Sequence, residues 1–300
     1  MKPSIALVAL LVSACGGSPD EPGLTPTDPA PVDPGEWGLR APLIAPNSEL
    51  AFAESNRKFY LLGGYPASRQ TVRTVQVYDI ASDSWGLGPP LPQPNNHGMA
   101  ASVNGKVYLI GGQTTADDPS YVNTVYELDP TTGVWVARAP MPTARSAGVA
   151  IVHEGKIYVA GGRPPQGHDF AVYDPTTDSW EVLPNLPTQR NHITGAAING
   201  RIHVVGGRQG PGLSPLMTPV HEVFDPETQA WTTAASMLRS RSGMNGVMAR
   251  GCFHVWGGEG PGVACSPTMT TTILAAANGH AWTTCPSPFT AFTDQPLWTI

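Results

Sequence analysis

The residues best suited to chemistry are three arginines and two asparagines at one repeated position. Each stands ten residues after a tryptophan, and they are Asn47, Asn95, Arg145, Arg190 and Arg241. A guanidinium presents a rigid fork of N–H donors that binds a carboxylate through two hydrogen bonds. These five are therefore the candidate binding residues. At equivalent positions of successive repeats they would form a ring, and such a ring would suit a carboxylate or an acidic sugar as ligand. The alternative, which we favour, is that each arginine binds a carboxylate of a neighbouring repeat, such as Asp129 or Asp174.

No other residue pattern predicts a catalytic or metal site. The sequence has no Gly-x-Ser-x-Gly elbow, no His-Glu-x-x-His, no phosphate-binding glycine loop and no EF-hand loop. Its eight histidines and four cysteines lack the His-x-x-x-His and Cys-x-x-Cys spacings typical of zinc ligands. We therefore expect no catalytic residue, no metal and no cofactor. A net charge of −6 with only 13% charged residues also argues against nucleic acid as a partner.

The candidate ring depends on a repeat that runs through most of the chain. Five glycine pairs each follow a tryptophan by 26 residues. The tryptophans are Trp37, Trp85, Trp135, Trp180 and Trp231, and the pairs are Gly63-Gly64, Gly111-Gly112, Gly161-Gly162, Gly206-Gly207 and Gly257-Gly258. The gap between a pair and the next tryptophan varies, at 22, 24, 19 and 25 residues, so the loops differ there. A fixed period of this length is typical of repeat architectures.

Each repeat is predicted to hold four short antiparallel strands. An aspartate stands six residues before each of the last four tryptophans and begins a polar turn, as in Asp174-Pro-Thr-Thr. The residue before it is apolar, as at Tyr173, within an alternating run typical of a half-buried strand. Glycine and proline account for 33 and 32 of the 300 residues, which excludes a helical bundle. Glycine pairs would let a neighbouring backbone or ring approach where a Cβ would clash.

This pattern resembles the kelch repeat, in which one strand ends in Gly-Gly, a second in Tyr-Asp-Pro, and a third carries the tryptophan. The resemblance covers Trp37 to Trp231 and continues to Gly258 through the glycines alone. It implies an all-β fold, a β-propeller whose blades are the repeats, because stacking buries both apolar faces of each sheet. A sialidase-type Asp box at Ser82–Trp85 is the nearest rival, but it does not predict the glycine pairs.

We expect kelch blades over residues 37–262, nominally part of a six-bladed ring. Trp37 belongs to a strand without its own glycine pair, and in kelch propellers such a strand completes the last blade. The C-terminal segment 263–300 departs from the pattern, because Ala275 and Ala276 replace the expected aromatic and aspartate ahead of Trp282. Two explanations stay open, a degenerate last blade or a slip of the reading frame near Val263, and the last blade is incomplete under both.

The N-terminus resembles that of a bacterial lipoprotein. The apolar run Ile5–Val12 is too short to span a bilayer but long enough for a secretory signal, and the lipobox-like Val-Ser-Ala-Cys ends at Cys15. The resemblance implies a signal peptide over residues 1–14 and a lipid on Cys15; otherwise that cysteine belongs to an ordinary secretory signal. Residues 15–36, rich in proline, aspartate and glycine, are predicted to form an extended tether. Gly16 favours the outer membrane or cell surface over the inner membrane.

Three further cysteines, Cys252, Cys265 and Cys285, predict no particular disulfide. We expect a non-catalytic module of the cell envelope that binds a protein or glycan, with contacts from the variable segments 65–74, 113–123 and 208–219.

The alternative function is that of a carbohydrate-active kelch enzyme, similar to galactose oxidase or a sialic-acid epimerase. No cysteine lies where galactose oxidase needs its Cys-Tyr cross-link, so its copper chemistry is not supported. Glu222 and Glu259 are acid/base candidates by residue type only, and solvated loop carboxylates are the simpler interpretation of both.

Overall fold

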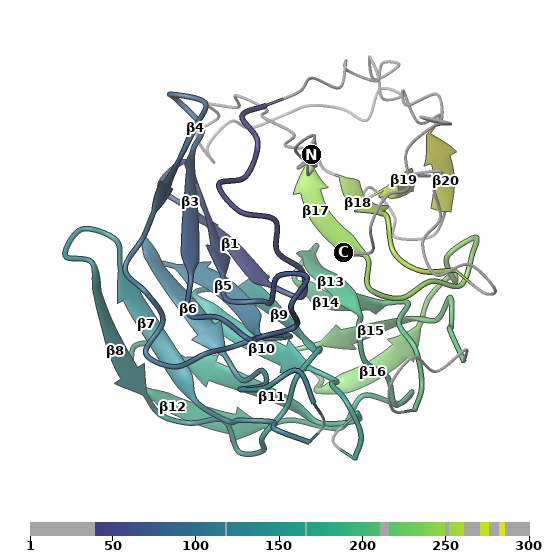
Figure 1. Cartoon of the computed structure of the whole chain (residues 1–300). Helices are drawn as coiled ribbons and strands as arrows, with labels where there is room; N and C mark the ends of the chain where they lie inside the picture. The colour runs from purple at the N-terminus through teal and green to yellow at the C-terminus, as the bar shows by residue number, and fades with distance from the viewer. Residues whose placement is uncertain are drawn as a thin grey trace, which may run out of the picture.

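The protein is built from five four-stranded antiparallel sheets arranged as the blades of a propeller (Figure 1). This computed structural model describes residues 40–117, 119–165, 167–210, 216–249 and 252–260, together with the backbone of 271–275 and 282–285. Within each sheet the strands lie in sequence order from the inner to the outer strand. The all-β propeller predicted from the repeat is therefore confirmed. The signal peptide, Cys15, the tether and Trp37 lie outside the described residues.

The strands are short and regular. Blade 1 comprises β1 (Ala51–Ser55), β2 (Lys58–Leu62), β3 (Val75–Asp79) and β4 (Ser84–Leu87). Blade 2 comprises β5 (Met99–Val103), β6 (Lys106–Ile110), β7 (Val125–Asp129) and β8 (Val134–Arg138). Blade 3 comprises β9 (Val149–His153), β10 (Lys156–Ala160), β11 (Phe170–Asp174) and β12 (Ser179–Val182). Blade 4 comprises β13 (Thr194–Ile198), β14 (Arg201–Val205), β15 (His221–Asp225) and β16 (Ala230–Thr233). Blade 5 comprises β17 (Asn245–Ala249), β18 (Cys252–Trp256), β19 (Thr271–Ala275) and β20 (Trp282–Cys285).

The hydrophobic core lies between neighbouring blades. The alternating burial of β1 puts Ala51 and Ala53 on the face that packs against Val107 and Leu109 of blade 2. Similar apolar layers join blades 2 and 3, blades 3 and 4, and blades 4 and 5. A single blade would expose both of these faces, so each sheet is stabilised by its neighbours.

Each described tryptophan of the repeat ties its blade to the preceding segment of the chain. The indole of Trp135 donates its N–H to the carbonyl of Pro89 at 3.0 Å, and that of Trp180 donates to Ala139 at 2.8 Å. The acceptor stands four residues after the previous tryptophan in both cases. Trp85 donates in the same way to Ala41, four residues after Trp37. The segment around Ala41 therefore takes the place that an outer strand of a preceding blade would take.

The glycine pairs join consecutive blades through the backbone. The second glycine of a pair donates its N–H to a carbonyl of the next blade, as from Gly64 to Asn95 at 2.7 Å. The first glycine adopts a left-handed conformation, with φ of 66° at Gly63, and a Cβ there would lie 2.1 Å from the Asn95 carbonyl oxygen. The expectation that these glycines admit a neighbouring backbone is confirmed. Gly257 has open space around it, since no described blade follows blade 5.

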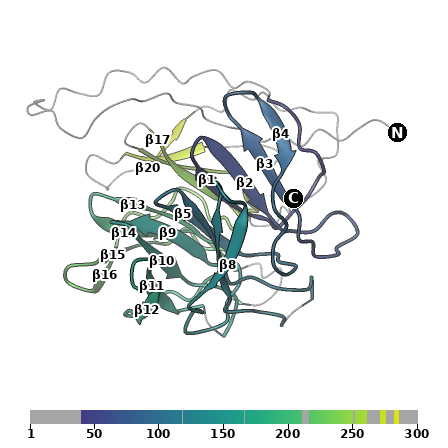
Figure 2. The same ribbon diagram turned by 90° about the vertical axis from the view of Figure 1, so that its left-hand side faces the viewer.

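The ring is open, as an incomplete set of blades predicts. The inner strands β1, β5, β9, β13 and β17 pack in succession around the axis, but no comparable contact links β17 back to β1 in the described part of the chain (Figures 1 and 2). Blade 5 includes β19 and β20, with Leu274 opposite Trp282. The apolar partner of this tryptophan is therefore one residue earlier than the Ala275 that repeat spacing indicated. Within the described residues, no helix has the length and hydropathy needed to cross a bilayer.

Candidate functional site

The side chains of the predicted ring point into the body of the propeller, not into its axial channel. Arg145 and Arg190 are completely buried, Asn95 is 1% exposed and Arg241 is 8% exposed. Arg145 donates to the carbonyl of Asp169 at 2.6 Å and to that of Gly161 at 3.3 Å. Asn47, Asn95 and Arg241 likewise donate to the first glycine of the pair in their own blades. The donors of these side chains are bonded to backbone carbonyls of their own blades, away from the cluster described next.

The ring residues bond within their own blades, with partners other than those expected. Asp129 and Asp174 pair with Lys106 and Lys156 of their own blades, not with the arginines. Arg190 contacts a carboxylate of its own blade, that of Glu222, at 2.6 Å. Burial lowers the pKa of the Arg190 guanidinium to about 10. The expected pairing of these arginines with carboxylates of a neighbouring repeat is therefore wrong: the side chains of Arg145 and Arg190 bond within their own blades, mainly to backbone carbonyls.

The side chains that meet near the propeller axis stand two residues further along the chain. The residue twelve positions after each tryptophan lies just before an inner strand and has a positive φ in every blade: Glu49, His97, Ala147, His192 and Gly243. His97 of blade 2 and His192 of blade 4 meet with ring centroids 5.3 Å apart, with the small Ala147 of blade 3 between them in sequence order. Side chains from non-adjacent blades therefore converge at this end of the channel.

A second set of residues surrounds the first. The residue after each glycine pair is bonded through its backbone to the residue eleven positions after a tryptophan. The residues that follow the glycine pairs are Tyr65, Gln113, Arg163, Arg208 and Glu259. We call these five residues, with Glu49, His97, Ala147, His192 and Gly243, the channel mouth.

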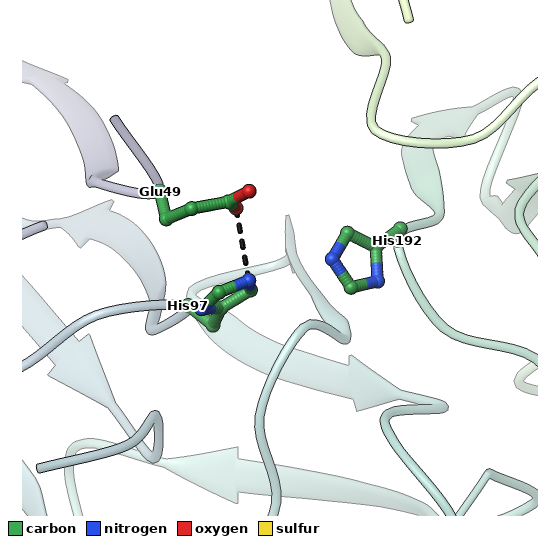
Figure 3. Close-up of side chains that lie close together, drawn as sticks. All are labelled: Glu49, His97 and His192. Atoms are coloured by element: carbon green, nitrogen blue, oxygen red, sulfur yellow. Dashed lines mark ion pairs between the residues drawn. The ribbon is translucent and has the colours of Figure 1, made fainter. Parts of the chain in front are cut away.

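The polar groups of the channel mouth form one connected cluster (Figure 3). Oε2 of Glu49 lies 3.0 Å from Nε2 of His97, and a guanidinium nitrogen of Arg163 lies 3.0 Å from the same Nε2. Arg208 contacts Nε2 of His192 at 3.0 Å and pairs with Glu259 at 2.6 Å. All five blades supply groups to this cluster, so it forms only when the propeller is assembled.

Each imidazole forms a hydrogen bond with the asparagine that precedes it in the sequence. Nδ1 of His97 lies 2.6 Å from Oδ1 of Asn96, and His192 makes the same contact with Asn191. The amide nitrogen of Asn96 donates to Thr71 and Thr115, which turns its oxygen toward the imidazole. Since an amide oxygen can only accept, Nδ1 carries the proton and Nε2 presents its lone pair to the channel.

Burial keeps both imidazoles neutral. Loss of solvent, followed by the charges of Arg163 and Arg208, lowers the pKa of His97 to about 3. The same causes hold the pKa of His192 well below its usual range. Burial also raises the pKa of Glu49, against the opposing effect of the two arginines. At neutral pH the permanent positive charges of this cluster are therefore those of its guanidiniums.

The cluster contains a donor set that could hold a metal ion, but its charge opposes one. Ligand atoms of Glu49, His97 and His192 lie within 4.8 Å of one another, and two imidazoles with one carboxylate is a known transition-metal set. Both Nε2 lone pairs already accept hydrogen bonds from the guanidiniums of Arg163 and Arg208. Like unit charges 4 Å apart repel by about 4 kcal/mol near a protein surface, and a divalent ion doubles that. The arrangement favours an anion over a cation.

The prediction from sequence placed the site on the ring residues and not on His97 and His192. It missed Glu49, Arg163 and Arg208, although these stand at fixed distances from the repeat markers. Aligning the repeats on their tryptophans and glycine pairs would have shown that the polar residues cluster at these two positions. Cys252 is free, and the side chains of the other cysteines lie outside the described residues.

Comparison with known proteins agrees with the architecture. The profile of the KLHDC2/KLHL20/DRC7 Kelch-repeats domain matches residues 41–207 and again residues 100–288. No curated protein sequence matches the chain. Among solved structures, that of YjhT superposes with a TM-score of 0.72 at 15% sequence identity, over 83% of this chain and 87% of that one. An identity this low establishes a shared fold only. Because the family profile spans well over half of the sequence, the chain belongs to the Kelch-repeat family.

Proposed function

We propose that the protein is a lipid-anchored binding module of the bacterial cell envelope that recognises an acidic group on a protein or glycan. The observation that carries this proposal is the pair of guanidiniums at the channel mouth, those of Arg163 and Arg208. They are 9% and 2% exposed; each contacts a neutral imidazole, and Arg208 also pairs with Glu259. A carboxylate entering the mouth would offer both guanidiniums charged acceptors in a poorly solvated place, where such hydrogen bonds are strong.

The positions of the variable loops also support the channel-mouth end of the propeller as the contact surface. The segments 65–74, 113–123 and 208–219 connect the second and third strands of their blades. Each begins at a channel-mouth residue, Tyr65, Gln113 or Arg208. Residues that differ between repeats therefore surround the charged cluster, as expected where a rigid scaffold carries a specific site on its loops.

Replacing the two guanidiniums should abolish acid recognition while leaving the fold. We expect Arg163→Ala and Arg208→Ala each to weaken binding of an acidic ligand by about thirty-fold or more, because removing one partner of a buried charged hydrogen bond costs about 2–5 kcal/mol. A glycan array, followed by titration calorimetry with the acidic glycans it identifies, measures this. The matched control is Arg201→Ala, which removes a surface arginine at the opposite end of β14 from Arg208.

Lysine variants provide a control for loss of binding that results from unfolding. Arg163→Lys and Arg208→Lys keep the charge but lose the fork, and we expect them to lose most of the affinity as well. Equal binding by wild type and both lysine variants would contradict the proposed role of the guanidiniums.

The membrane anchor is the part of the proposal that rests on sequence alone. The lipobox-like residues ending at Cys15 support it. We expect wild-type protein to label with a radioactive fatty acid and to enter the detergent phase of a Triton X-114 extract, and Cys15→Ser to do neither. Detergent-phase partition of Cys15→Ser would show that this cysteine is not the anchor.

A second candidate function, a carbohydrate-active enzyme, is favoured by one contact. Glu49 and His97 lie 3.0 Å apart beside the arginines, in the arrangement of an acid and a base near a bound acidic sugar. Of the two carboxylates singled out in the sequence, Glu259 lies at the channel mouth, but Glu222 is buried between blades against Arg190 and Thr188. Turnover of any glycan that the array identifies, with loss in Glu49→Gln, would replace the binding-module proposal.

A further inference from the structure

One atom of the channel mouth, Nε2 of His97, has more partners than it can satisfy. Nδ1 carries the imidazole proton and faces Oδ1 of Asn96 at 2.6 Å, so Nε2 has a single lone pair. A guanidinium N–H donor of Arg163 lies 3.0 Å from Nε2 of His97. Oε2 of Glu49, which can only accept when ionised, also lies 3.0 Å from this Nε2. The lone pair can accept from Arg163, or it can carry a proton that Glu49 accepts, but it cannot do both.

His192 provides an internal comparison. It has the same asparagine behind it and the same arginine contact in front, from Arg208 at 3.0 Å. No ion pair joins it to a carboxylate in the part of the chain that the structure describes. Glu49 lies within 4.8 Å of His192 as well, but its carboxylate pairs with His97 at 3.0 Å, so His97 is the better placed of the two imidazoles to share a proton with it.

We infer that binding of an acidic group to Arg163 and Arg208 draws one proton from water onto Nε2 of His97, which Glu49 then holds as an ion pair. This inference rests on the proposed function. When Arg163 turns its N–H toward the ligand, the hydrogen bond to Nε2 breaks and the new N–H of His97 donates to Oε2 of Glu49. One negative charge enters with the ligand and one positive charge enters with the proton, so the buried cluster keeps its net charge.

The charged groups around His97 set the direction of the pH dependence. Arg69, Arg163 and Arg208 face it from the loops after β2, β10 and β14 and disfavour a second positive charge, which together with burial lowers its pKa to about 3 in the free protein. Glu49 before β1 contacts it directly, and Glu259 after β18 is bonded to Arg208. A bound anion offsets the guanidiniums and so raises the pKa of His97. A site whose bound form holds more protons binds more tightly as the pH falls.

The experiment is a pH series of titration calorimetry with D-glucuronate, whose carboxylate stays ionised throughout. Measurements run from pH 5 to pH 8 at constant ionic strength, in two buffers of different ionisation enthalpy at each pH. We expect the affinity of the wild-type protein to rise toward tenfold for each unit that the pH falls, with uptake of about one proton per ligand. Glu49→Gln should flatten this dependence whatever its affinity at pH 8, and His192→Gln should retain it.

The outcomes separate the inference from the function on which it rests. Glucuronate binding that depends on Arg163 and Arg208 but takes up no proton between pH 5 and pH 8 overturns the inference and leaves the proposed function standing. Proton uptake that survives Glu49→Gln and disappears in His192→Gln also overturns it. Failure of the wild-type protein to bind glucuronate, or undiminished binding by Arg163→Lys with Arg208→Lys, overturns both.

Discussion

Gly63→Ala is expected to lower the free energy of unfolding by about 3–5 kcal/mol. The left-handed φ of 66° at Gly63 costs an alanine about 1 kcal/mol. The new Cβ would stand 2.1 Å from the carbonyl oxygen of Asn95, which is backbone and cannot rotate away. Relieving this overlap strains the chain by about 1–3 kcal/mol and weakens the hydrogen bond from Gly64 to Asn95 by about 1 kcal/mol. Urea unfolding followed by tryptophan fluorescence measures the change.

A second glycine separates backbone strain from the clash. Gly133 has a similar φ of 71°, but nothing lies within 4 Å of where its Cβ would be. Gly133→Ala should therefore cost only about 1 kcal/mol. If Gly63→Ala and Gly133→Ala destabilise equally, the close approach of the next blade has no energetic weight.

Arg190→Met is expected to be comparably severe, at about 3–5 kcal/mol, because it leaves the carboxylate of Glu222 buried without its partner. Arg190 is completely buried and Glu222 is 3% exposed, with 2.6 Å between their charged atoms. Breaking such a pair costs far more than the pair contributes over a hydrophobic replacement. Chemical denaturation compared with that of wild-type protein tests the estimate.

The double variant Arg190→Met with Glu222→Met is the decisive comparison. It removes both charges and should recover most of the lost stability. Arg145→Met serves as the matched single variant, because Arg145 is equally buried but its donors contact backbone carbonyls and the sulfur of Met141 instead of a carboxylate. A double variant as unstable as Arg190→Met alone would show that the damage comes from lost packing and carbonyl contacts, not from the stranded carboxylate.

The repeat markers made the fold predictable because each has one mechanical role. The indole of Trp180 reaches a carbonyl of the previous blade, and the left-handed Gly63 admits the backbone of the next. Roles of this kind require one residue type at one spacing, so they leave a period that can be read without a structure. The register of the last blade was less predictable, because Trp282 pairs with Leu274, eight residues earlier, where the tryptophans of the other blades pair with the residue seven positions earlier.

The site could not be predicted from strand alternation. Arg190 and His192 stand two residues apart, so a regular strand would turn them to the same face. His192 instead has a φ of 52°, and this left-handed residue redirects the chain just before β13. Arg190 consequently faces the protein interior while His192 faces the channel. The positive φ recurs at Glu49 and His97, residue types that give no warning of it.

The joint between blades has a consequence for how such chains diversify. A peptide N–H of Gly64 meets a peptide carbonyl of Asn95, and the equivalent bond at Gly112 meets Arg145. Every amino acid has a backbone carbonyl, so this hydrogen bond between blades does not depend on which side chain the acceptor residue carries. Duplication or exchange of whole units would therefore preserve this backbone joint while changing the residues at the channel mouth.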